Sequence, residues 1–209
     1  HHSKHQFVSK HETFLMKISM VGLVICGVCL GVRAEVYEPQ IQIRFPDQIA
    51  QLPLIGRHQF PTPELGVSLG YQGTVRATVY VYHAGFNTIP TDIHAPVLYQ
   101  QIGQASQDIQ TMQQRGAIQQ LQAIDPEPLV MTHVGCGTTF LRQQFRFMFA
   151  QENAPMLSSA VYLTSLNNHF VKLRISYPQS DQSAEAQANE FVRQIGRLLA
   201  GCDTPADSV

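Results

Sequence analysis

The second half of the sequence contains three stretches in which apolar and polar residues alternate and β-branched and aromatic side chains are frequent: 140–150, 157–165 and 170–177. Alternation with a period of two is typical of strands that bury one face. A loop at 152–155 and a tight turn at Asn167-Asn168 connect the stretches, so consecutive strands can pair antiparallel. The pattern predicts a three-stranded meander and restricts the fold to one built on an antiparallel sheet.

The first half of the sequence predicts a hairpin followed by a helix. Alternating runs at 66–71 and 75–82 flank a glycine-containing turn at 72–74, as expected for a β-hairpin. Between Pro96 and Gly116, apolar residues recur at spacings of three and four, which is the pattern of an amphipathic helix. The apolar face of this helix is expected to comprise Leu98, Ile102, Ala105, Ile109 and Met112.

A second amphipathic helix is predicted between Pro178 and Gly201. Pro178 ends the last strand of the meander, and Asp181 or Ser183 can cap the helix that follows. Gly201 is a typical residue after a helix end. The apolar face is expected to comprise Ala188, Phe191, Val192, Ile195, Leu198 and Leu199.

The order of elements indicates the fold class. Hairpin, helix, meander and helix predict an α+β domain at 66–202, with a mostly antiparallel sheet covered by two amphipathic helices. Residues 35–65 are expected to pack on this domain, with one short helical turn at 47–54, and 203–209 to form a flexible tail. Residues 118–124 fit either a strand or the tail of the first helix. Glycine-rich phosphate-binding motifs do not occur, so no nucleotide cofactor is expected.

A leader sequence is expected at 16–34. Lys17 follows Met16, the run 18–30 is apolar, and Ala34 ends a motif typical of signal-peptidase cleavage. The apolar run is shorter than the roughly 20 residues of a membrane-spanning helix, so only transient membrane contact is expected. Cleavage after Ala34 predicts a periplasmic or secreted protein, and 1–15 is interpreted as a tag or translated upstream sequence.

Lipid attachment at Cys26 or Cys29 is the alternative to simple cleavage. These cysteines follow Ile25 and Val28, whereas a lipid-attachment cysteine usually follows a small residue.

The charge of the chain after cleavage disfavours nucleic acid as a partner. Without residues 1–34, the chain keeps 10 of its 14 basic residues and 14 of its 15 acidic residues, a net charge of about −4. Nucleic-acid binding requires a clear cationic surface. A protein or a small molecule is therefore the expected class of partner.

Cleavage would also leave two cysteines, Cys136 and Cys202. In an exported protein the simplest interpretation is one disulfide, which would join the end of the second helix to the middle of the sheet. Two buried free thiols are the alternative.

Four segments carry a resemblance: FPDQIAQL, LGVSLGY, RATVYVYHAGFNTIP and VYLTSLNNHFVKLRISYP. They resemble a group of exported bacterial proteins that have no assigned activity and share an A-T-V-Y-[VI]-Y-x-x-G-x-x-x-I-P strand. At the level of fold the chain is similar to the Mog1/PsbP-like sandwich. The resemblance implies a binding or assembly role more than catalysis, and it brings no catalytic residues to this chain.

His133 and Cys136 give two hypotheses about chemistry. With His83 and His94 they could bind zinc, but the spacing matches no zinc motif, and no metal is expected. Cys136 between two glycines could also act as a nucleophile, with His133 as its base, in a hydrolase or redox protein. No Asn or Asp is placed by a motif to orient the base. Glycines that ease a turn into the next strand are the plainer interpretation.

Basic residues on two strands suggest a binding surface. Arg142 and Arg146 share a face of one strand, and Lys172 and Arg174 share a face of another. If the register placed all four on one side of the sheet, they would form a cationic patch for an anion or an acidic strand. The alternative is solvated strand faces, because a slip of one residue reverses the face.

Tyrosines in the strands suggest a ligand groove or simple packing of the sheet. We include Tyr162 among the candidate binding residues. The sequence as a whole predicts an exported, non-enzymatic binding or accessory protein that uses a sheet face. The alternatives are a hydrolase or redox protein that depends on Cys136 and His133, and a structural accessory of an envelope complex.

Overall fold

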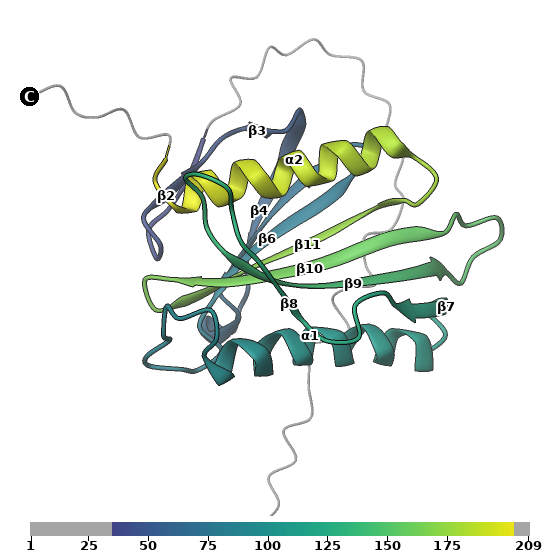
Figure 1. The fold of residues 1–209 in the computed structure, drawn as a ribbon, viewed down its shortest axis with the longest axis horizontal. Coiled ribbons are helices and arrows are strands. Elements are labelled where there is room, and N and C mark those ends of the chain that lie inside the picture. Colours follow the sequence, from purple (N-terminus) through teal and green to yellow (C-terminus); the bar gives the residue numbers. More distant parts are fainter. Residues whose placement is uncertain (1–34, 203–209) are drawn as a thin grey trace, which may run out of the picture. The chain divides into compact units, whose positions relative to one another are not determined.

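The computed structural model describes residues 35–202 of the chain, which form one antiparallel main sheet, a small N-terminal hairpin and two helices (Figure 1). The predicted leader at 16–34, the sequence before it and the predicted tail at 203–209 lie outside the described residues. The small hairpin pairs β1 (Val36–Glu38) with β2 (Ile43–Phe45). The other strands are β3 (Gln48–Ile49), β4 (Leu52–Gln59), β5 (Val67–Gln72), β6 (Arg76–Tyr82), β7 (Ile118–Ala123), β8 (Leu129–Met131), β9 (Phe140–Phe149), β10 (Leu157–Leu166) and β11 (His169–Pro178).

The main sheet has the strand order β3-β4-β5-β6-β11-β10-β9-β7, and β8 also pairs with β9. The predicted hairpin is β5–β6, and the predicted meander is β9–β10–β11. The last strand, β11, pairs with β10 on one side and with β6 on the other. It therefore joins the hairpin to the meander in one sheet.

The two helices lie on opposite sides of the main sheet (Figure 1). α1 (Pro96–Gln114) contacts β7, β9 and β10, whereas α2 (Gln182–Leu199) contacts β3 and β11. Each helix buries its apolar stripe in a separate cluster, for example Ile102 with Phe147 on one side and Phe191 with Leu173 on the other. The Asp181 side chain caps α2 by accepting a hydrogen bond from the backbone N–H of Ala184 at 3.0 Å. These findings confirm the α+β class with a mostly antiparallel sheet and two helices.

The helical turn predicted at 47–54 is wrong, because this stretch forms the β3–β4 hairpin. Its two turn residues, Ala50 and Gln51, have the left-handed φ values of 48° and 64°. Gln194 of α2 accepts a hydrogen bond from the backbone N–H of Ala50 at 2.9 Å, and Gln187 donates one to its carbonyl oxygen at 2.9 Å. The turn is held by tertiary contacts that local sequence does not reveal. β4 continues into the main sheet through β5.

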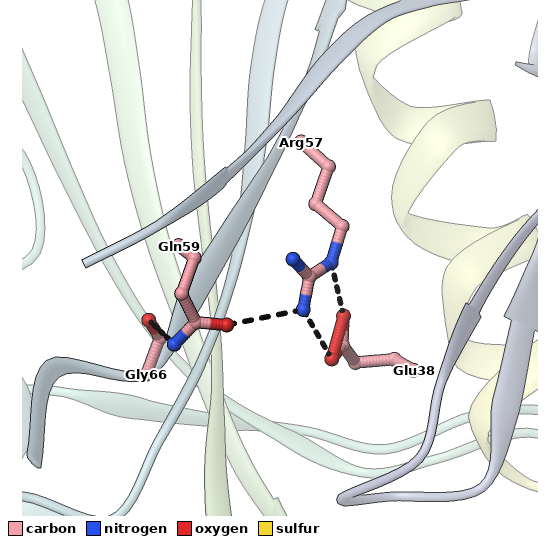
Figure 2. Close-up of polar contacts among 4 residues, drawn as sticks. All are labelled: Glu38, Arg57, Gln59 and Gly66. Carbon is pink, nitrogen blue, oxygen red and sulfur yellow. Dashed lines mark hydrogen bonds and ion pairs between the residues drawn. The ribbon is translucent and has the colours of Figure 1, made fainter. Parts of the chain in front are cut away.

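A partly buried ion pair attaches the N-terminal hairpin to β4 (Figure 2). The carboxylate of Glu38, which has no exposed surface, accepts two hydrogen bonds from Arg57, at 2.9 Å from Nε and 3.0 Å from Nη2. Arg57 Nη2 also donates to Gln59 Oε1 at 3.2 Å, and Gln59 Nε2 donates to the carbonyl oxygen of Gly66 at 3.1 Å (Figure 2). The hydrogen bonds to Glu38 raise the pKa of Arg57.

The predicted disulfide between Cys136 and Cys202 is present, with 5.9 Å between the two Cα atoms. It joins the β8–β9 loop to Cys202, shortly after the C-terminal end of α2 at Leu199. A backbone hydrogen bond from Thr138 N–H to the carbonyl oxygen of Gly196, at 3.0 Å, makes a second connection between the loop and α2. The end of α2 is therefore fixed over the start of β9.

Candidate functional site

The register of the central strands separates the four predicted basic residues into two pairs. Tyr162 of β10 lies opposite Arg142 of β9 and opposite Leu173 of β11. Directly opposite residues of antiparallel strands share a face, and Leu173 belongs to the cluster that α2 covers. Arg142 and Arg146 therefore lie on the α2 side. Lys172 and Arg174 lie on the α1 side, so the single cationic patch considered from the sequence does not form.

The pair on the α2 side is partly neutralised. Arg142 Nε lies 3.3 Å from Oδ2 of Asp125, a buried carboxylate that also accepts the backbone N–H of Gln144 at 3.1 Å. Tyr162 is 7% exposed and packs edge-on against Phe140, with 6.0 Å between ring centroids. Burial raises the pKa of Tyr162, and the positive charge of Arg142 opposes this rise. On this side Arg146 is half-buried, and a separate cavity of about 650 Å³ lies between α2 and the β3–β4 turn.

The pair on the α1 side belongs to a larger surface, which we call the basic shelf and define as Arg76, Tyr80, Lys172 and Arg174. In the β6–β11 register Tyr80 lies opposite Lys172, and Arg76 is two positions before Thr78, which lies opposite Arg174. All four side chains therefore point to the same face. Arg76 is exposed and the other three are half-buried.

One edge of α1 borders the basic shelf. Arg174 Nη2 donates a weak hydrogen bond to Met112 Sδ at 3.6 Å, and the Tyr82 hydroxyl donates to Gln101 Oε1 at 3.2 Å. The carboxylate of Asp108, also on α1, accepts a hydrogen bond from Gln104 Nε2 at 3.1 Å. Because α1 packs mainly on β7, β9 and β10, the shelf over β6 and β11 stays accessible beside the helix.

Lys172 is the electrostatic centre of the basic shelf. Its Nζ lies 4.9 Å from the ring centroid of Tyr80 and 5.2 Å from that of Tyr82, and among residues 35–202 the ammonium has no hydrogen bond or ion pair. Desolvation and, to a smaller extent, repulsion from Arg174 lower the pKa of Lys172 to about 8, and Asp108 opposes the shift. A half-buried ammonium without a hydrogen-bonded counter-ion is suited to bind an anion.

The structure places His133 and Cys136 close together, but Cys136 is oxidised. Its sulfur is bonded to Cys202, so it cannot act as a thiolate nucleophile in this state. A Cβ atom at Gly137 would lie 2.4 Å from Cγ of His133, and one at Gly196 would lie 3.3 Å from its Nε2. These two glycines therefore make room for the imidazole ring.

The residues considered for zinc are not brought together as a set. His83 packs edge-on against His169, with 6.0 Å between ring centroids, and Cys136 is in the disulfide. Within residues 35–202, no three His, Cys, Asp or Glu side chains form a group that could hold a metal ion. None of the helices in this range has both the length and the apolar character to cross a membrane.

Sequence reasoning missed Arg76, Tyr80 and Asp108 as parts of the surface. The period of two does place Arg76 and Tyr80 on one face of their strand. Their pairing with β11 joins residues about 90 positions apart, and the position of Asp108 beside Lys172 depends on how α1 crosses the sheet. Neither the pairing of β6 with β11 nor the position of Asp108 beside Lys172 can be recognised from the local sequence.

Comparison with known proteins shows a similarity to a solved structure but to no family model. No protein-family model matches the chain, and no curated protein is a match. Among solved structures, the chain is similar to the solution structure of cyanobacterial PsbP (CyanoP) from Synechocystis sp. PCC 6803. The two share 11% sequence identity over 81% of this chain and 95% of that chain, with a TM-score of 0.48. A likeness of this size carries no functional conclusion.

Proposed function

We propose that this chain is an exported, non-enzymatic accessory protein that binds an acidic segment of a partner protein on the basic shelf. The observation that carries the proposal is Lys172, a half-buried ammonium beside Arg174 with no hydrogen-bonded counter-ion among the described residues. An acidic partner would supply that counter-ion. The local positive charge makes this possible although the chain as a whole is slightly acidic.

The shape of the basic shelf favours a protein segment over a small molecule. Small-molecule sites are usually concave pockets of roughly 300–1,000 Å³. The shelf is instead a partly exposed sheet face beside one helix, and the cavity that Lys172 and Arg174 line measures about 20 Å³. An extended or helical acidic segment could lie beside α1 over β6 and β11, with its carboxylates near the three basic side chains.

Two observations support the exported and non-enzymatic parts of the proposal. Disulfides persist mainly in oxidising compartments, and Cys136 and Cys202 form one here. The leader-like pattern at 16–34 agrees with a periplasmic or secreted location. The same disulfide removes the thiolate that a hydrolase based on Cys136 and His133 would need.

The test is the binding of a fluorescein-labelled, glutamate-rich peptide, measured by fluorescence anisotropy at several salt concentrations. The double variant Lys172→Gln/Arg174→Gln is expected to weaken binding about tenfold or more, which corresponds to about 1.4 kcal/mol. The control is Arg142→Gln/Arg146→Gln, which removes the same number of charges from the opposite face and is expected to keep the affinity within about twofold.

Equal losses in the two double variants would overturn the proposal, because the peptide would then respond only to net charge. Absence of binding to the unmodified protein at low salt would also overturn it. Circular dichroism of both variants checks that each retains its fold.

A further inference from the structure

A small recess lies under the basic shelf, between α1 and the central strands. Its volume is about 20 Å³, and its lining residues are Ala105, Asp108, Ile109, Val161, Lys172 and Arg174. A space of roughly 10–15 Å³ is sufficient for one water molecule. The recess can therefore hold one small polar atom or group, and it is too small for a sugar, a nucleotide or an aromatic ring.

The charged groups around the recess come from two elements. β11 contributes Lys172 and Arg174, and α1 contributes Asp108, while β10 contributes only the apolar Val161. Tyr80 and Tyr82 of β6 face the ammonium through their rings. With Lys172 protonated, the lining carries two positive charges and one negative charge. One monovalent anion would make the total zero, whereas a divalent anion would leave an excess of negative charge in a partly desolvated space.

We propose that the recess is an anchoring subsite that takes one carboxylate group of the bound segment and discriminates against sulfate and phosphate. This inference rests on the proposed function, because it identifies the chemical group of the acidic segment that the basic shelf holds most tightly. One carboxylate oxygen enters the recess beside Lys172, and the second oxygen remains outside, where the guanidinium of Arg174 can donate to it. A tetrahedral divalent oxyanion would also leave its other oxygens outside the recess, but its second negative charge exceeds what the lining can balance.

The position of Asp108 strengthens the discrimination. Its carboxylate accepts a hydrogen bond from Gln104 and repels any anion that approaches from the α1 side. The attraction of a divalent anion to Lys172 and Arg174 is doubled just as its repulsion by Asp108 is, whereas the cost of desolvating the anion rises with the square of its charge. Because Asp108 reduces the net charge of the lining to a single positive charge, a small, singly charged anion is the one whose desolvation the recess compensates best.

The closing experiment is a pH titration of the Lys172 side chain by NMR, on the unmodified protein, in sodium acetate, sodium chloride and sodium sulfate at equal ionic strength. A bound anion stabilises the ammonium form, so it raises the pKa of Lys172 from its lowered position. Acetate is expected to raise it by about half a unit or more relative to chloride, and sulfate is expected to give no larger rise than chloride. The subsite proposal would be overturned if sulfate raised the pKa of Lys172 as much as acetate does, or if acetate did not raise it relative to chloride.

Variants separate the recess from general charge effects. Arg174→Gln is expected to abolish the difference between acetate and chloride. The control Arg142→Gln, on the opposite face, is expected to retain it. If the glutamate-rich peptide binds but acetate has no effect on the pKa of Lys172, the subsite proposal is wrong and the proposal of peptide binding on the basic shelf stands. If acetate raises the pKa of Lys172 but the peptide does not bind, the recess is a site for small anions and the proposed function is wrong.

Discussion

Glu38 and Arg57 form an unequal pair, because the carboxylate is fully buried and the guanidinium is one-third exposed. Removal of either partner leaves the other without its counter-charge, and the cost depends on whether the remaining group can reach water. Arg57 can reach solvent. Glu38 cannot, because the N-terminal hairpin and β4 enclose it.

Arg57→Ala is therefore expected to destabilise the protein by about 3–5 kcal/mol, the cost of an unpaired buried charge. Glu38→Gln is the matched variant, and it is expected to cost about 1–2 kcal/mol, because the amide can still accept a hydrogen bond and the arginine can turn to solvent. Denaturant unfolding of the two variants measures the difference. Equal losses would show that the carboxylate of Glu38 remains hydrated when Arg57 is removed.

The charged form of Lys172 lowers the stability of the folded protein, because part of its side chain is desolvated. Its pKa is about 8 in the folded protein and 10.5 in an exposed chain. Below pH 8 the lysine is charged in both states, and the folded state bears the full cost of the desolvated charge. Between pH 8 and 10.5 the unfolded state binds more protons, so stability rises with pH as the folded lysine becomes neutral.

Lys172→Met is accordingly expected to stabilise the protein at pH 7, by on the order of 1–2 kcal/mol, less than the pKa shift alone implies because solvent reaches part of the side chain. The gain should shrink as the pH rises from 8 to 10.5. Thermal unfolding at several pH values measures it. Arg146→Met, on the opposite face, is the control, since arginine stays charged throughout this range and should give no such pH dependence. A constant difference for Lys172→Met would contradict the explanation.

At the scale of elements, the disulfide and a backbone hydrogen bond hold the end of α2 against the β8–β9 loop. The disulfide closes a sequence separation of 66 residues, and loss of such a cross-link typically costs about 2–4 kcal/mol. Cys136→Ser/Cys202→Ser is expected to lower stability by this amount. Hydrogen exchange should show faster opening of the last turn of α2, while peptide binding at the basic shelf is retained because the shelf lies on the other side of the sheet.

The same double variant also tests the alternative that depends on Cys136 and His133. A hydrolase or redox protein would lose its activity with these cysteines, whereas an accessory protein would lose only stability. Loss of peptide binding in a variant that remains folded would contradict the assignment of function to the basic shelf.

The hydrophobic pattern predicted the long elements of the fold but not the short β3–β4 hairpin. Long periodic stretches predicted α1, α2 and the meander correctly, because each buries a continuous apolar face and the period reflects that burial. The β3–β4 hairpin was missed because Ile49 and Leu52 are three positions apart, a spacing that also fits a helix. Its turn consists of Ala50 and Gln51 instead of glycine or asparagine, and glutamine side chains of α2 hold it.

At the scale of the whole molecule, export remains a proposal that a mass measurement can test. An intact, non-reduced mass of the exported product is expected to correspond to a chain that starts at Glu35 and lacks two hydrogens because of the disulfide. A lipid adduct, or a chain that retains 16–34, would contradict cleavage after Ala34. A mass with two free thiols would contradict the oxidised state and reopen the nucleophile hypothesis.

The sequence alone determined the class of the fold and the long elements, because the burial of apolar faces appears as a local pattern of residues. It predicted the disulfide but left two free thiols as the alternative. It also identified Arg142 and Arg146 on β9 and Lys172 and Arg174 on β11 as candidate binding residues. Only the tertiary structure decided which of them act together. A register difference of one residue moves a side chain to the opposite face, and the register of β11 against β6 and β10 depends on contacts between distant parts of the chain. Those contacts separate Arg142 and Arg146 from Lys172 and Arg174, and they bring Arg76, Tyr80 and Asp108 to the candidate site.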